Sequence, residues 1–173
     1  GGAGGGPVIV LVGFMGAGKS TVGRLLAARL GVPFVDADAA IEAAEGRTIP
    51  AIFEADGEPG FRRIEAEVVR GLLDGPEAVL ALGGGTLGSA SVREALAGHR
   101  VVLLDVSLEH ALARVGDDAS RPMLRNRDLP ELYAARQQAY REAADIVVCV
   151  DGRAPQQVVA RVLEALGEAG VGE

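Results

Sequence analysis

The stretch GFMGAGKS at residues 13–20 constrains the fold of this chain more than any other part of its sequence. It fits the pattern G-x-x-x-x-G-K-[ST], in which glycines let backbone N–H groups turn inward around phosphate groups. An apolar run at residues 8–12 comes before it and predicts a buried parallel strand. Residues 21–30 follow with apolar side chains at helical spacing, and Gly31 is placed to end that helix. This order of strand, loop and helix predicts a phosphate-binding loop (P-loop) at the positive end of a helix.

Two side chains of the P-loop have the chemistry that a bound nucleotide needs. Lys19 is the only lysine among 17 lysine and arginine residues, so a chain that otherwise uses arginine keeps a compact point charge here. We expect Lys19 to reach the terminal phosphates of ATP and the Ser20 hydroxyl to hold Mg²⁺. Further contacts to the phosphates are expected from Gly16, Ala17, Gly18 and Thr21.

Composition restricts the class of protein. The 173 residues suffice for one domain, and because 49% of them are apolar but only 3% aromatic, its core should be aliphatic. We expect a flexible tail at residues 1–7, one domain over 8–168 and a second tail over 169–173. A net charge of −7 without a basic run argues against nucleic-acid binding, and no apolar run has the length of a membrane span. Without a recognisable signal peptide we expect a cytoplasmic monomer whose single Cys149 is a buried structural thiol.

Apolar runs alternate with helical patterns, which predicts an α/β fold with a five-stranded parallel sheet and helices on both faces. The expected strands lie at residues 8–12, 33–35, 79–82, 101–104 and 146–150. The expected helices lie at residues 19–30, 37–45, 48–55, 58–73, 90–97, 107–115, 130–143 and 155–167. Thr48 and Ser107 are candidate N-caps, and Pro130 and Pro155 suit first-turn positions. Residues 116–128 lack periodicity and hold three arginines, which favours a lid.

The second expected strand runs into a pair of aspartates, Asp36 and Asp38. Two residues apart on an extended chain, their carboxylates point the same way, at the strand end where open parallel sheets bind ligands. One carboxylate would serve the metal, and the other would accept a hydrogen bond from a substrate hydroxyl. The alternative is that one of them caps the following helix.

Three consecutive glycines at residues 83–85 follow the expected strand at 79–82, where many P-loop proteins place an aspartate for Mg²⁺. Glycines directly after a strand let another molecule approach the backbone closely. The alternative is a turn that is merely flexible.

One helix carries a possible anion-binding pair. Arg62 and Glu65 lie three residues apart, so they share a helix face. They form either a surface ion pair or a guanidinium that Glu65 positions for a substrate carboxylate. The buried stripe of the same helix is expected to consist of Phe61, Ile64, Val68 and Leu72.

Five segments together make the chain resemble the shikimate kinases from residue 8 to about residue 166. They are GFMGAGKSTVGRLLA, DADAAIEAAEGRTIPAIFEADGEPGFRRIE, LALGGG, RPML and ARQQAYREAAD, in the order and at the spacing of that family. The departures are small: Ala37 stands where threonine is frequent, and Thr48 where serine is frequent. Neither departure removes a group with a named role.

The resemblance implies ATP-dependent phosphorylation of the 3-hydroxyl of shikimate, on the route to chorismate and aromatic amino acids. It implies that Lys19, Asp38 and Arg121 are catalytic, with Arg121 in a lid that closes on the ATP phosphates. Asp36 would contact Mg²⁺ through a water molecule. The residues that it assigns to shikimate are Asp38, Arg62, Gly84, Gly85 and Arg136. The residues that it assigns to adenine are Arg114, Arg153 and Pro155.

Two other classes of function remain open on sequence grounds. A gluconate or nucleoside monophosphate kinase shares the P-loop and lid but does not need the aspartate pair, the Arg62 helix and the three glycines together. A kinase-like binding module without turnover would usually have lost one of these groups. The histidines His99 and His110 are expected to be structural or superficial and remote from every motif.

Overall fold

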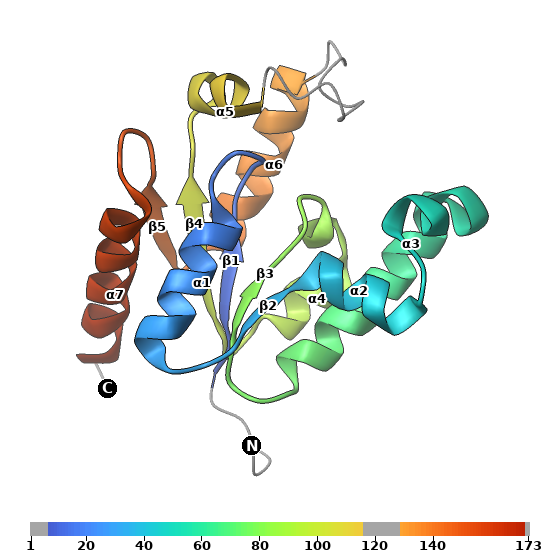
Figure 1. Cartoon of the computed structure of the whole chain (residues 1–173), viewed down its shortest axis with the longest axis horizontal. Helices are drawn as coiled ribbons and strands as arrows, with labels where there is room; N and C mark the ends of the chain where they lie inside the picture. Colours follow the sequence, from blue (N-terminus) through green and yellow to red (C-terminus); the bar gives the residue numbers. More distant parts are fainter. Residues whose placement is uncertain (1–6, 116–128, 172–173) are drawn as a thin grey trace.

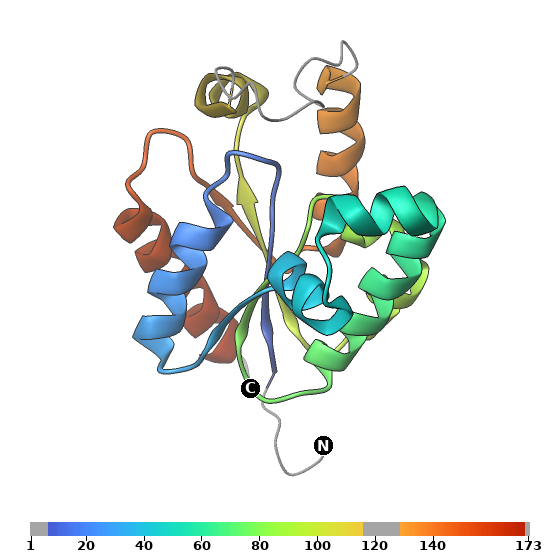
Figure 2. The same cartoon turned by 45° about the vertical axis from the view of Figure 1, so that its right-hand side comes forward.

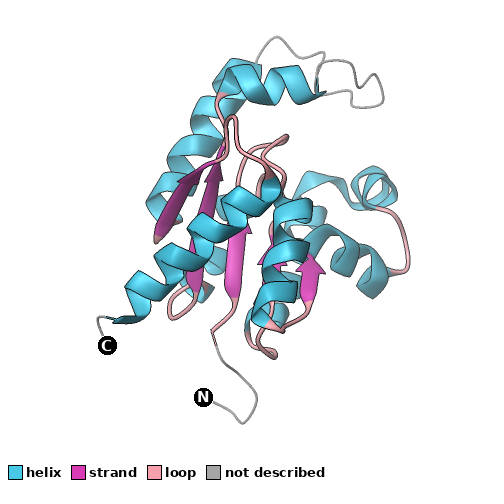
Figure 3. Ribbon diagram, turned by 60° about the vertical axis from the view of Figure 1, so that its left-hand side comes forward, coloured by secondary structure: helices cyan, strands magenta, loops and turns pink. Residues whose placement is uncertain are grey.

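The computed structural model describes residues 7–115 and 129–171, which form a parallel five-stranded sheet in the order β2-β3-β1-β4-β5. The expected α/β architecture is therefore confirmed, with helices on both faces (Figure 3). The strands are β1 (Ile9–Val12), β2 (Phe34–Asp36), β3 (Val79–Ala81), β4 (Arg100–Asp105) and β5 (Ile146–Cys149).

Strand β1 is the centre of the sheet because its residues are apolar on both faces. Val10 lies opposite Leu80 of β3 and opposite Val101 of β4, and all three side chains are buried. A continuous apolar run suits a parallel strand that is covered by helices on both sides. This placement puts the P-loop, which follows β1, at the middle of the carboxyl edge of the sheet.

Seven helices connect and cover the strands in the described part of the chain. They are α1 (Lys19–Leu30), α2 (Ala37–Glu45), α3 (Ile49–Leu73), α4 (Ala90–Ala95), α5 (Leu108–Val115), α6 (Leu129–Ala143) and α7 (Pro155–Val171). Helices α1 and α7 pack together on one face of the sheet, and α3 packs against α4 on the other (Figures 1 and 2). None of the helices over residues 7–115 and 129–171 combines the length and apolar character that a membrane span needs.

Local signals at the helix ends behave as the sequence predicts. Thr48 Oγ1 accepts a hydrogen bond from Ala51 N at 3.2 Å, and Ser107 Oγ accepts one from His110 N at 3.1 Å. Gly31 ends α1 in the left-handed conformation with φ 71°, which a side chain would make costly. These local contacts fix where the three helices begin or end.

Helix α3 confirms one prediction and corrects another. The helices expected at residues 48–55 and 58–73 meet at a kink at Gly57, whose φ of 71° and ψ of 177° are not helical, so the expected break is confirmed. The buried stripe after the kink includes Phe61 as expected, but it continues through Glu65, Val69 and Leu73, one residue away from the expected positions. The expected stripe residues Ile64 and Val68 instead pack on a smaller apolar cluster formed by Ile41, Ile52 and Phe61.

The prediction for Cys149 is wrong, because its side chain is exposed. Strand β5 is an edge strand, and its residues alternate: Ile146 and Val148 are buried, while Val147 is 49% exposed. His99 is structural, as expected, because its Nδ1 accepts a hydrogen bond from Val8 N at 2.9 Å.

Candidate active site at the carboxyl edge of the sheet

A cavity of about 740 Å³ lies at the carboxyl ends of β1, β2 and β3. Its walls come from the P-loop, the start of α2, helix α3, the three-glycine turn and helix α6. It brings together most of the predicted site residues: Gly16, Gly18, Lys19, Ser20, Thr21, Asp36, Asp38, Arg62, Gly84, Gly85 and Arg136. Residues far apart in the sequence thus share one cavity, as the strand-end argument predicts.

The P-loop ends where α1 begins, at Lys19. Gly16 and Gly18 have φ values of 84° and 85°, a conformation that lets successive N–H groups face inward. Gly18 occupies the N-cap position without a side chain to satisfy the first N–H groups of the helix, which leaves that end suited to an anion. Lys19 Nζ donates to Gly13 O at 2.7 Å. Ala17 does not line the cavity, and its N–H already donates to Phe14 O at 3.1 Å.

Both aspartates line the cavity, but not because they alternate on an extended strand, as predicted. Asp36 is the last residue of β2, whereas Asp38 already lies in the first turn of α2, which begins at Ala37. Asp36 is the N-cap of this helix: its Oδ1 accepts hydrogen bonds from Asp38 N at 2.9 Å and Ala39 N at 3.3 Å. The capping alternative is therefore correct for Asp36, which lines the cavity as well.

Asp38 has an electrostatic environment that favours its neutral form. Although its side chain is open to the cavity, the surrounding walls remove enough water to raise the pKa of its carboxyl. The nearby carboxylates of Asp36 and Glu65 raise this pKa further, whereas Lys19 lowers it. A carboxylate with a raised pKa accepts a proton more readily than an ordinary aspartate does.

The three glycines are needed for close approach, and the approaching groups are side chains of the chain itself. A Cβ at Gly83 would lie 2.9 Å from Asp38 Oδ1, and one at Gly84 would lie 3.0 Å from Arg136 Nη1. At Gly85 it would lie 2.5 Å from Arg62 Nη2. Any side chain in this turn would therefore displace a residue that was predicted to bind the substrate.

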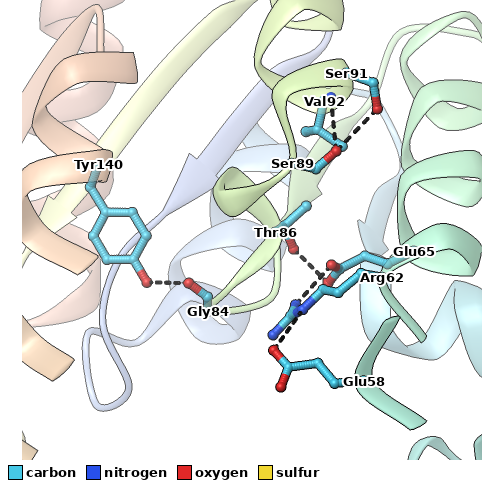
Figure 4. Close-up of polar contacts among 9 residues, drawn as sticks. All are labelled: Glu58, Arg62, Glu65, Gly84, Thr86, Ser89, Ser91, Val92 and Tyr140. Atoms are coloured by element: carbon cyan, nitrogen blue, oxygen red, sulfur yellow. Dashed lines mark hydrogen bonds and ion pairs between the residues drawn. The ribbon is translucent and has the colours of Figure 1, made fainter. Parts of the chain in front are cut away.

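Arg62 is held by buried groups (Figure 4). Its Nη1 donates to Glu65 Oε1 at 2.8 Å, and Thr86 Oγ1 donates to Glu65 Oε2 at the same distance. Glu65 is 3% exposed and Thr86 is fully buried, so the alternative of a surface ion pair is wrong. We call Arg62, Glu65 and Thr86 the α3 arm. The sequence reasoning missed Thr86, although its place directly after the three glycines could have drawn attention to it.

Arg136 is held from the other side by α6. Tyr140, one helical turn later and 1% exposed, donates its hydroxyl to Gly84 O at 2.9 Å (Figure 4). Burial raises the pKa of the Tyr140 hydroxyl, and Arg136 partly opposes this. We call Arg136, Tyr140 and Gly84 the α6 arm. Tyr140 was also missed, but its spacing of four residues from Arg136 puts both on one helix face.

Polar side chains of helix α6 form hydrogen bonds with the end of strand β4 and the residue that follows it. Asp105 accepts hydrogen bonds from Gln137 Nε2 at 2.8 Å and from Arg141 Nη2 at 2.9 Å. Tyr133 Oη donates to Val106 O at 2.7 Å. These contacts fix the position from which Arg136 reaches the cavity.

The groups predicted to bind adenine are not gathered in this cavity. Arg153 Nη1 donates to Cys149 O at 2.6 Å and lines a second hollow of about 360 Å³ between β5 and α7. Pro155 begins α7 and lines neither hollow. Arg114 belongs to α5, while Arg121 and the expected lid lie outside the described residues.

His110 corrects one further expectation. Its Nδ1 lies 2.9 Å from Ser107 Oγ and 3.5 Å from Asp151 Oδ2. Asp151 opens the segment that contains Arg153 and Pro155, so His110 is not remote from every motif. Its contacts link the start of α5 to the loop after β5.

A parallel sheet with a P-loop after its central strand, and carboxylates and arginines across the same cavity, defines a P-loop kinase that phosphorylates a small anionic molecule. A family model described as shikimate kinase matches residues 15–167. A shikimate kinase from Streptomyces avermitilis is 50% identical over 163 residues, which cover 92% of this chain and 95% of the relative. The chain belongs to the shikimate kinase family.

Solved structures agree with this assignment. A shikimate kinase from Acinetobacter baumannii in complex with shikimate superimposes with a TM-score of 0.87, at 40% identity and 94% coverage of each chain. Another from Aquifex aeolicus gives a TM-score of 0.82 at 36% identity, covering 95% of this chain and 99% of the other.

Proposed function

We propose that this chain transfers the γ-phosphoryl group of ATP to the 3-hydroxyl of shikimate, giving ADP and shikimate 3-phosphate for chorismate and aromatic amino acid biosynthesis. The observation that carries the proposal is that one cavity has the P-loop on one wall and Asp38, Arg62 and Arg136 on the other. The relative from Acinetobacter baumannii, solved with shikimate bound, supports the same acceptor.

The acceptor side of the cavity matches a ring that carries one carboxylate and several hydroxyls. Arg62 and Arg136 each present a guanidinium, the group that binds a carboxylate through two parallel hydrogen bonds. The backbone of Gly84 and Gly85 adds contacts between them. Asp38 orients the attacking hydroxyl and accepts its proton, a role that its raised pKa supports.

The nucleotide side uses the P-loop. Residues Gly16, Gly18 and Thr21, which line the cavity, surround the phosphates, and Lys19 contacts the terminal ones. Ala17 was predicted with them but would reach a phosphate only if its N–H left Phe14 O. Arg121 closes over the phosphates with the segment 116–128, and Arg114, Arg153 and Pro155 contact adenine. The transition state of phosphoryl transfer is loose, so these residues act mainly by alignment and by stabilising negative charge.

The residues of this cavity also suit Mg²⁺. In the described part of the chain no cluster of three or more His, Cys, Asp or Glu side chains could enclose a metal ion. Mg²⁺ at kinase sites takes one or two protein oxygens and completes its shell with water and substrate phosphates, and Ser20 and Asp36 line the cavity with such oxygens. Ser20 would hold the ion directly, and Asp36 would hold it through water. When bound, the ion neutralises charge on the phosphates.

Each subunit is proposed to act alone in the cytoplasm, where ATP is available. One chain supplies every acceptor-binding group named above, so no residue from a second copy is needed. Sedimentation of the active protein at assay concentration tests the monomer.

An assay of ADP release tests the proposed function. With ATP and Mg²⁺, we expect shikimate to stimulate ADP release at least tenfold over the rate without acceptor, while gluconate and nucleoside monophosphates do not. Stimulation by one of those acceptors instead would identify another small-molecule kinase. No stimulation by any acceptor, together with retained shikimate binding, would identify a module without turnover.

A further inference from the structure

The Thr86 hydroxyl connects the glycine turn to Arg62, because both Thr86 and Arg62 donate hydrogen bonds to Glu65. Thr86 begins the short 3-10 helix Thr86–Gly88, and its backbone N–H donates to Gly83 O at 3.3 Å. Its side chain therefore moves with the turn. The hydroxyl donates to Glu65 Oε2 at 2.8 Å across 21 residues of sequence.

Each oxygen of the Glu65 carboxylate has its own donor. Thr86 takes Oε2 and Arg62 takes Oε1, so the plane of the carboxylate is set by two contacts made from different elements. A Cβ at Gly83 would lie 3.5 Å from Glu65 Oε2, which means that the carboxylate also rests against the turn itself. Without Thr86, one oxygen of a buried anion would lose its donor.

A second carboxylate lies near the same guanidinium. Glu58 Oε1 lies 3.7 Å from Arg62 Nε, one helical turn before it, and its side chain is 68% exposed (Figure 4). The contact with buried Glu65 is the shorter of the two, at 2.8 Å. In this position Arg62 lies against Gly85 and lines the cavity.

We propose that Thr86 is a positioning residue for Arg62, acting through Glu65, and that its hydroxyl sets the affinity for the acceptor carboxylate. This rests on the proposed function, in which Arg62 binds that carboxylate. Thr86 does not itself reach the acceptor, since it is absent from the lining of the cavity.

Three variants test the proposal. Thr86→Val removes the hydroxyl at nearly constant volume, Thr86→Ser keeps it, and Ser91→Ala removes a hydroxyl from the neighbouring helix outside this relay. We expect Thr86→Val to raise the KM for shikimate about tenfold, with kcat and the KM for ATP changed by less than about twofold. Thr86→Ser and Ser91→Ala should both stay within about twofold of wild type in all three constants.

A double-mutant cycle shows whether Thr86 acts through Arg62. In an Arg62→Ala background, Thr86→Val should add less than about twofold to the KM, because the group that it positions is gone. If Thr86→Val is unfolded at the assay temperature, Thr86→Ala replaces it in the same comparisons.

The proposal is overturned if loss of the hydroxyl leaves the shikimate KM unchanged, if it raises the KM for ATP equally, or if its effect persists without Arg62. Failure of the proposed function has a different signature, since wild type would then release no ADP in response to shikimate.

Discussion

The α3 arm and the α6 arm hold two similar arginines in different ways. Arg62 donates to a buried carboxylate that is itself held by Thr86. Arg136 lies against the backbone of Gly84 and beside the neutral hydroxyl of Tyr140. Over residues 7–115 and 129–171, no carboxylate forms an ion pair with Arg136.

This difference gives the two arginines different roles: Arg62 has a fixed orientation, and Arg136 has an unbalanced charge. The positive charge of Arg62 is largely balanced by Glu65 before any substrate binds, so the α3 arm mainly supplies a fixed direction. The charge of Arg136 stays available to an incoming anion. Removing Arg62 also leaves a buried anion behind, whereas removing Arg136 leaves neutral groups. Asp38 lies against Gly83, the first glycine of the turn that both arms contact, and is the group expected to act on the reacting hydroxyl.

The largest effect should come from Asp38, which belongs to neither arm. Asp38→Asn keeps the shape of the side chain but cannot accept the proton, so kcat should fall roughly 100- to 10,000-fold. The KM for shikimate should change much less, because both arginines remain. Steady-state kinetics at saturating ATP measure both constants, and an unchanged kcat would show that Asp38 does not take part in the chemistry.

The pH dependence of catalysis and of stability tests the same role of Asp38. Its pKa is raised in the folded protein, so kcat/KM of wild type should fall with decreasing pH already above the range of an ordinary aspartate. The raised pKa also means that folding favours the protonated form, and this stabilisation is lost as pH rises through the folded pKa. Asp38→Asn should therefore unfold at a higher temperature than wild type at neutral pH. A lower unfolding temperature would contradict the assigned environment.

Arg62→Ala should have the largest effect on acceptor binding. It removes an attraction and leaves the Glu65 carboxylate near the acceptor anion, so the KM for shikimate should rise roughly 100-fold to several thousandfold. The free energy of unfolding should fall by about 1–3 kcal/mol, because Glu65 is 3% exposed and loses its partner. Chemical denaturation and kinetics measure the two effects. Adding Glu65→Gln should restore stability and lower the KM in part; no recovery would mean that the carboxylate was not the cause.

Arg136→Ala should weaken acceptor binding without weakening the fold. We expect the KM for shikimate to rise roughly 30- to 300-fold, and the free energy of unfolding to change by less than about 1 kcal/mol. Arg136→Lys should recover little, since an ammonium does not reproduce the planar fork. A stability loss as large as that of Arg62→Ala would remove the contrast between the arms.

Tyr140→Phe should have the smallest effect of this series. It removes the donor of Gly84 O but retains the ring, so we expect a rise of about threefold in the KM for shikimate and a loss of about 1 kcal/mol in stability. A change in the KM for ATP of the same size would show that the bond supports the whole domain rather than the α6 arm.

Local sequence patterns predicted the strands, the loop after β1 and several helix ends. The apolar runs predicted all five strands, the glycines at residues 13–18 predicted the loop between β1 and α1, and Thr48 and Ser107 marked helix starts. The P-loop motif and the family resemblance together named most of the polar residues that line the cavity, but few of its apolar ones. What these signals share is that each is contained in a short stretch of chain.

Contacts between distant segments could not be predicted in this way. Thr86 and Glu65 are 21 residues apart, and Tyr140 and Gly84 are 56 residues apart, so no local spacing signals either bond. The exposure of Cys149 depends on β5 being an edge strand, which only the strand order reveals. The buried stripe of α3 differs from the expected one because Glu65, although charged, is buried through its hydrogen bonds with Arg62 and Thr86.

The exposed Cys149 allows the protein to be labelled at a single site. It is the only cysteine in the chain and does not line the main cavity, so a thiol-reactive fluorophore attaches at one known position without prior removal of other thiols. Its own carbonyl accepts the hydrogen bond from Arg153, a residue assigned to adenine. Under the proposed adenine site, a dye on Cys149 would stand next to the bound nucleotide, and a change in its emission on addition of ATP would test that placement without altering the acceptor side.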